Sequence, residues 1–151
     1  MIQRIQTVWL FLAVIALLLT CCLPLATFEP QGMGLPSTMY SLCLLSADAV
    51  ALSLLPLCPF CLLVLAEAVT IFALFGYKNR KRQMTFCNIA MTLEVLWIAV
   101  YFIVAMMIQG DNSFKPCFGA CLPLVALILT LMARKGVKHD EDLVRSADRI
   151  R

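Results

Sequence analysis

The stretch LPLCPFCLLVLAEAVTIFALFGYKNRKRQ, from Leu55 to Gln83, contains the two features that decide the fold of this chain. Its first part is an apolar run with a single acid, Glu67, and is long enough to cross about 30 Å of hydrocarbon as a helix. Its second part, from Tyr77 to Arg82, is short and strongly basic. Apolar runs that alternate with basic links are typical of proteins that cross a membrane several times.

The composition of the whole chain supports this interpretation. Of its 151 residues, 62% are hydrophobic and only 14% are charged, and the mean hydropathy is +0.92. Soluble proteins have about 25% charged residues, so a soluble fold of this length cannot cover so much apolar surface. The net charge of +3 is gathered in short groups beside the apolar runs, which favours orientation in a bilayer over nucleic-acid binding.

Four apolar stretches are long enough to span a bilayer, at about residues 6–25, 54–76, 84–108 and 116–133. They predict an all-α membrane protein, a four-transmembrane-helix antiparallel bundle that forms one domain over residues 1–151. We expect the first stretch to stay as an anchor instead of being removed as a signal. Thr20 before Cys21 makes a poor lipoprotein cleavage site, and removal would leave an odd number of spans.

The positions of lysine and arginine predict the orientation. Arg4 precedes the first span, the link at 78–82 joins the second and third, and Arg134 and Lys135 follow the fourth. The segment at 26–53 has neither lysine nor arginine. Because positive residues stay on the cytoplasmic side, we expect a multi-pass protein of the bacterial inner membrane with both termini in the cytoplasm.

Two segments lie outside the predicted spans. Residues 27–53 begin with the turn-forming stretch EPQGMGLP and become apolar from Tyr40 to Leu45, which predicts a segment that lies on the bilayer surface or packs against the helix ends. The tail at 134–151 predicts a short amphipathic cytoplasmic helix, with Leu143, Ala147 and Ile150 at helical spacing. This helix either lies solvated against the inner leaflet or docks a cytoplasmic partner.

Two cysteine pairs are redox candidates because each sits where an outward-facing helix is expected to begin. They are Cys58 with Cys61, and Cys117 with Cys121. Free N–H groups at a helix start stabilise a thiolate, and Pro59 suits the first helical position. Four spans with an outward Cys-x-x-Cys resemble quinone-linked disulfide-generating membrane enzymes. The alternative, which we favour, is that cysteine packs here as a small apolar residue.

Two acids interrupt the apolar runs, Glu67 in the second span and Glu94 in the third. Each lies nine or ten residues from the basic link, or about 13 to 15 Å at 1.5 Å per residue, so both fall at one level. One hypothesis is a proton or cation pathway between the helices. The other is a protonated, hydrogen-bonded pair that sets helix register, helped by Thr70, Thr92 or Tyr101.

The two ends and the basic link carry a recognisable pattern: MIQRIQTVWLFLA at the start, YKNRKRQ in the middle and KHDEDLVRSADRIR at the close. In these motifs the chain resembles an uncharacterised family of small four-helix inner-membrane proteins from Bacteroidetes, called domain of unknown function 4293. The resemblance implies a membrane protein whose marked motifs lie on the cytoplasmic face. It implies no known activity.

Since no catalytic constellation is complete, we expect a non-enzymatic binding or assembly component that acts through its cytoplasmic face. The expected partners are the lipid bilayer and a cytoplasmic or membrane protein. We predict no metal site and no cofactor, apart from a quinone if the redox alternative holds. The candidate binding residues are Gln3, Arg4, Arg80, Arg82, Asp140, Glu141, Arg145, Asp148 and Arg149, with the arginines 4, 80 and 82 expected to pair with the acids at 140–142.

Overall fold

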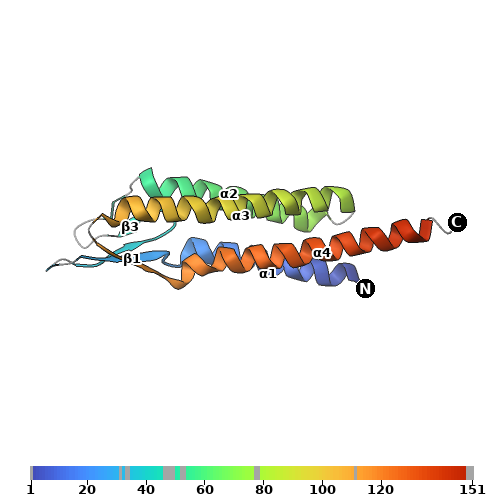
Figure 1. Ribbon diagram of the computed structural model, residues 1–151, viewed down its shortest axis with the longest axis horizontal. Helices are drawn as coiled ribbons and strands as arrows, with labels where there is room; N and C mark the ends of the chain where they lie inside the picture. Colours follow the sequence, from blue (N-terminus) through green and yellow to red (C-terminus); the bar gives the residue numbers. More distant parts are fainter. Residues whose placement is uncertain are drawn as a thin grey trace.

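The computed structural model describes residues 2–30, 32, 35–45, 50–51, 54–76, 79–110 and 112–148. Figure 1 shows four helices side by side, with a small sheet at one end. The start of the first helix and the end of the last lie at the opposite end (Figure 1). The helices are α1 (Ile2–Cys22), α2 (Leu54–Phe75), α3 (Arg80–Gln109) and α4 (Leu122–Asp148), the last preceded by a 3₁₀ helix, η2 (Phe118–Cys121).

The chain is mostly helical, and four helices are long and apolar enough to cross a membrane. Helix α1 packs against α4 and α2 packs against α3, while contacts between α3 and α4 and between α1 and α2 join the two pairs. Small residues stand at the contacts, for example the buried Ala13 and Ala16 of α1 and Ala126 of α4. Small side chains let helix backbones approach closely, which is how helices associate when lipid surrounds them.

The prediction of an all-α protein is wrong, because five short strands form a sheet beyond the helix ends. The strand order is β4-β3-β2-β1-β5 and every pair is antiparallel. In β1, Ala26 and Phe28 are buried, whereas Thr27 is half-buried and Glu29 is exposed. This period of two is a strand pattern, but over four residues it is too short to be recognised in sequence. The bounds are β1 (Ala26–Glu29), β2 (Ser37–Met39), β3 (Leu44–Leu45), β4 (Val50–Ala51) and β5 (Ser113–Pro116).

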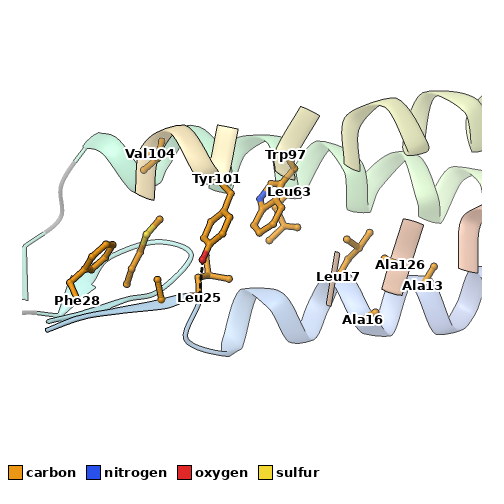
Figure 2. Close-up of a cluster of buried hydrophobic side chains, with 12 residues drawn as sticks. Ala13, Ala16, Leu17, Leu25, Phe28, Leu63, Trp97, Tyr101, Val104 and Ala126 are labelled. Carbon is orange, nitrogen blue, oxygen red and sulfur yellow. Dashed lines mark hydrogen bonds between the residues drawn. The ribbon is translucent and has the colours of Figure 1, made fainter. Parts of the chain in front are cut away.

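The sheet packs directly on the helices. Phe28 and Met39 belong to the same buried cluster as Leu17, Trp97 and Tyr101 (Figure 2). The Tyr101 hydroxyl donates a hydrogen bond to the Leu25 carbonyl oxygen at 2.9 Å, which ties α3 to the chain just before β1. In the apolar segment at 40–45, Leu44 packs against this cluster, whereas Leu42 and Leu45 are exposed, so the two predicted alternatives for this segment stay open.

Two boundaries of the fourth span differ from the prediction. Residues 113–116 form β5, so α4 begins at Leu122 and not near Pro116. At its other end, α4 continues as one helix to Asp148, and the tail is not a separate helix. The helix does not stop at Gly136 because α1 packs there: a Cβ added to Gly136 would stand 2.8 Å from Gln6 Cγ, and the next residue, Val137, is buried.

Candidate functional site

The structure brings the two membrane acids together between α2, α3 and α4. Glu94 of α3 is completely buried, and Glu67 of α2 is half-buried. Leu63, one turn before Glu67, and Trp97, three residues after Glu94, belong to one buried cluster, so the two acids lie at similar levels of α2 and α3. Glu67 lies eight residues before the end of α2, whereas Glu94 lies fourteen residues after the start of α3, so the predicted equal distance from the link is wrong. The two acids face each other because α2 and α3 pack along their length.

These carboxyls have few hydrogen-bond partners. The Thr130 hydroxyl of α4 donates to Glu94 Oε1 at 3.2 Å. The same hydroxyl also donates to the Ala126 carbonyl oxygen at 2.9 Å, so it is shared between two acceptors. Among the described residues, Glu94 Oε2 and both carboxyl oxygens of Glu67 are buried without a hydrogen-bond partner. Buried polar atoms are nearly always paired, so this cluster is incomplete as a purely structural device.

The helpers predicted for this pair are wrong. Thr70 donates to Ala66 O, Thr92 donates to Ile89 O on an exposed face, and Tyr101 donates to Leu25 O. Threonine hydroxyls in helices commonly bond a carbonyl one turn back, which takes them away from the acids. Sequence reasoning missed Thr130. The buried residues Ala126, Thr130 and Ala133 follow helical spacing, and this pattern marks the inward face of α4.

In the described chain all eight cysteines are free. Cys58 and Cys61 are both exposed on α2. The expectation that Pro59 begins this helix is wrong: α2 begins at Leu54, so Pro59 lies in the second turn. Only the first four N–H groups of a helix are free, so Cys58, the fifth residue, lacks the donor environment that would favour a thiolate.

The second cysteine pair flanks η2. Cys117 precedes the 3₁₀ helix, and its Sγ lies 3.7 Å from Thr27 Oγ1. Cys121 ends the 3₁₀ helix and is exposed. Redox activity of either pair stays a prediction. Among the described residues, no group of three histidine, cysteine, aspartate or glutamate side chains is placed to hold a metal ion.

Among the predicted binding residues at the other end of the helices, Asp140 has a defined partner. Its Oδ2 accepts a hydrogen bond from Gln6 Nε2 at 2.6 Å, and both side chains are buried. Sequence reasoning missed Gln6. Arg82 is exposed, and its backbone N–H donates to Asn79 Oδ1 at 3.4 Å, which caps α3. Glu141 is half-buried.

The remaining binding candidates lie outside the residues whose side chains the structure describes. They are Gln3, Arg4, Arg80, Arg145, Asp148 and Arg149. The expected pairing of Arg4 and Arg80 with the acids at 140–142 therefore stays a prediction. For Arg82, whose side chain is described, the structure has no ion pair with these acids, so that part of the prediction is wrong.

Four helices able to cross a membrane, with a buried acidic pair between them and a small sheet at one end, define a small helical membrane protein. Residues 2–150 match a family described as a domain of unknown function, DUF4293, and the chain belongs to this family. Comparison with curated proteins gives no significant match.

Proposed function

We propose that this protein is a multi-pass component of the bacterial inner membrane, with both termini in the cytoplasm and the sheet outside. The support is the charge distribution: Arg82 lies in the first turn of α3, at the end away from the sheet, and Arg134, Lys135 and Lys138 lie from the middle of α4 onward in the same direction. At the sheet end Lys115 is paired with Glu29 at 2.6 Å, and the segment at 26–53 has neither lysine nor arginine. An excess of lysine and arginine marks the cytoplasmic side. A reporter that is active only in the cytoplasm, fused after Arg151, should be active, and an inactive fusion would reverse the orientation.

Within that orientation, the best-supported function is docking of a cytoplasmic protein by the end of α4. The observation that carries this proposal is that α4 continues to Asp148 and projects beyond the other three helices (Figure 1). Leu143 and Val144 on this projection are 49% and 45% exposed. Neighbouring Asp142 is also exposed, so the projection is amphipathic. Apolar side chains on a solvated helix end gain stability only when a partner covers them.

The base of the projection is held rigidly. Gln6 of α1 donates to Asp140, and Val137 is buried one turn earlier. A helix that is fixed at its base and free at its tip loses little entropy on binding. Amphipathic helices of this kind insert their apolar face into a groove of the partner. Because Glu141 and Asp142 stand beside the apolar pair, the partner we propose is a soluble protein whose apolar groove is bordered by basic side chains.

The test compares two double substitutions on this helix in the full-length protein. Leu143→Gln with Val144→Gln removes the apolar pair. The matched control, Lys138→Gln with His139→Gln, changes two adjacent exposed residues of the same helix that are not part of the proposed docking surface. A photo-crosslinker placed at Ser146 should capture one soluble protein from cells with the wild type and the control, and lose it with the apolar double substitution. Equal capture by all three proteins would refute docking through this face.

A second function, proton exchange at the acidic pair, is favoured by one geometric observation. The Thr130 hydroxyl has a single proton but lies within hydrogen-bond distance of both Glu94 Oε1 and the Ala126 carbonyl oxygen. It can share its proton between the two acceptors, or it can donate to Ala126 O while a protonated Glu94 donates to the hydroxyl oxygen; the second arrangement stores a proton on Glu94. With Glu67 nearby and unpartnered, the cluster has a place to hold a proton and a second carboxyl to receive it.

Proton flux in proteoliposomes tests this second function. Glu94→Gln and Glu67→Gln keep the shape of the side chain but cannot exchange a proton at the carboxyl, so each should abolish flux. Glu29→Gln is the matched control, since Glu29 is an exposed carboxyl in an ion pair on the sheet. Its flux should equal that of the wild type. No flux in the wild type, or equal flux in every protein, would remove this candidate.

A further inference from the structure

A groove of about 390 Å³ lies between α3 and α4, in the half of α3 away from the sheet. Its lining on α3 follows one helix face over two turns and consists of Asn88, Met91, Thr92 and Val95. Arg134 of α4 lines the other side. Among the lining residues that the structure describes, none belongs to the acidic pair or to the projecting end of α4, so the groove is a separate site.

The groove is polar at one end and apolar at the other. Helix α3 runs toward the sheet, so Asn88 stands at the end of the groove away from the sheet and Val95 at the nearer end. Thr130 of α4 contacts Glu94 of α3, and Arg134 lies one turn further from the sheet than Thr130. Arg134 therefore shares the polar end with Asn88. Such a groove matches an amphiphile with a polar head and an apolar chain.

Arg134 brings a positive charge into the groove. Its side chain is half-buried, and a guanidinium stays charged at physiological pH. Among the described residues the ion pair is that of Lys115 with Glu29 at the sheet, so Arg134 has no acidic partner there. A half-buried charge beside apolar side chains is costly without a partner. Because a guanidinium binds phosphate through two parallel hydrogen bonds, a phosphate group would supply the missing partner.

Two lysines extend the positive charge beyond the polar end. Lys138 lies one turn after Arg134 on α4, and Lys81 lies two turns before Asn88 on the same face of α3. Both lysines are exposed, and in the described part of the chain neither forms an ion pair, with the exposed Asp142 or any other acid. Basic groups that border a groove between membrane helices attract lipids with a net negative head group.

The apolar end of the groove opens to the bilayer. Val95 is 54% exposed, and Met91 is half-buried beside it. In a membrane the exposed apolar side chains of a spanning helix face the acyl chains of lipids. An acyl chain can therefore lie along these two side chains while its head group stays at the polar end. A free phosphate ion would make no use of this part, so the shape favours a lipid over a soluble anion.

We propose that this groove binds an anionic phospholipid. Its phosphate accepts hydrogen bonds from the side chains of Arg134 and Asn88, and one acyl chain packs on Met91 and Val95. The binding uses no residue of the acidic pair or of the proposed docking surface. Only the assignment of this lipid to the cytoplasmic leaflet rests on the orientation proposed above, and the reporter fusion tests that orientation separately.

Native mass spectrometry of the full-length protein in detergent, titrated with phosphatidylglycerol, tests the polar end. Arg134→Gln removes a charge-assisted hydrogen bond and should weaken binding about tenfold. Lys135→Gln is the matched control, because it removes the same charge at the next position, which is exposed and does not line the groove. Its affinity should equal that of the wild type. Equal losses in both variants would show that net charge alone attracts the lipid, and would overturn the proposal.

A second pair of variants tests the apolar end and does not depend on whether Arg134→Gln folds. Val95→Phe fills the groove without a change in charge and should weaken phosphatidylglycerol about fivefold, through the lost chain contact. Leu96→Phe is its control, since Leu96 is 48% exposed on the same helix but does not line the groove. It should bind as the wild type does. Equal affinities in the two variants would refute this site.

Two further ligands define what the groove recognises. Phosphatidylcholine with the same acyl chains carries a choline cation beside its phosphate, so it should bind about fivefold more weakly than phosphatidylglycerol, because Lys81 and Lys138 repel that cation. Glycerol 3-phosphate has the phosphate without acyl chains and should not displace the bound lipid. Equal binding of phosphatidylcholine, or displacement by glycerol 3-phosphate at comparable concentrations, would overturn an anionic phospholipid as the occupant.

Discussion

Asp140 at the end of α4 and Glu94 in the middle of α3 are both buried carboxyls, and their surroundings differ sharply. Asp140 accepts a hydrogen bond of 2.6 Å from Gln6, an amide that is itself buried. Glu94 receives only a 3.2 Å contact from Thr130, and its other oxygen has no partner among the described residues. Its neighbour Glu67 has none for either oxygen.

The contrast separates a structural acid from a candidate functional one. A satisfied carboxyl that joins two helices contributes to stability, and losing its partner is costly. A carboxyl left unsatisfied in the membrane costs stability in the resting structure, so its removal should raise the stability of the fold. The two regions should therefore respond in opposite ways when their polar groups are removed.

The largest change in the free energy of unfolding is expected at the pair of Gln6 and Asp140. Gln6→Leu leaves the Asp140 carboxylate buried without its donor, and the free energy of unfolding should fall by about 3 kcal/mol. Unfolding of the detergent-solubilised protein by a denaturing detergent measures it. Adding Asp140→Leu to this variant should restore most of the loss, because two apolar side chains can pack where the polar pair stood. If the double variant is no more stable than Gln6→Leu alone, the pair is not the source of the effect.

The next largest loss of stability is expected where α1 and α4 approach closely, at Gly136 beside the Gln6–Asp140 pair. In Gly136→Ala the new methyl would stand 2.8 Å from Gln6 Cγ, so the helices must separate or Gln6 must move, at a cost of about 2 kcal/mol. Gly76→Ala is the matched control, since its added Cβ would meet only Phe86 Cδ2 at 4.0 Å. The same unfolding measurement compares the two. Equal stabilities would show that the contact at Gly136 is loose.

At Glu67 and Glu94 the change in stability should have the opposite sign: removing the polar group should stabilise the protein. Glu67→Leu removes two unpartnered carboxyl oxygens and adds apolar contact, so the free energy of unfolding should rise by about 1 kcal/mol. Glu94→Leu should raise the free energy of unfolding by less than Glu67→Leu does, because it leaves Thr130 without its acceptor on α3. A loss of stability in Glu67→Leu would mean that Glu67 has a structural partner, and would remove the contrast with Asp140.

The smallest effect is expected for the single hydroxyl that reaches the acids. Thr130→Val keeps the shape of the side chain and should lower the free energy of unfolding by about 0.5 kcal/mol. Thr70→Val is its control, since Thr70 donates only to Ala66 O within its own helix. If the two variants lose the same amount, the contact of Thr130 with Glu94 contributes nothing to stability.

Much of the helical part follows from hydropathy alone. The runs that contain Leu63, Trp97 and Ala126 are long and apolar, and a chain in lipid must satisfy its backbone within such runs. The short link predicted that α2 and α3 are antiparallel neighbours, but the distances of Glu67 and Glu94 from it differ by six residues, so their level was set by the packing of the two helices. The sheet could not be predicted in this way. Strands β3 and β4 have two residues each, and Phe28 of β1 meets Phe114 of β5, far along the chain, only because α3 returns the chain there.

The order of apolar and basic segments by itself determined that this chain forms four long helices, since hydrocarbon tolerates neither charge nor unpaired backbone. The tertiary structure alone decided which polar atoms find partners. Gln6 reaches Asp140, Thr130 reaches Glu94, and Trp97 Nε1 remains unpaired, because each outcome depends on how helices distant in sequence are rotated against one another. A periodic pattern defines a helix face, but the partner of that face is set by packing in three dimensions.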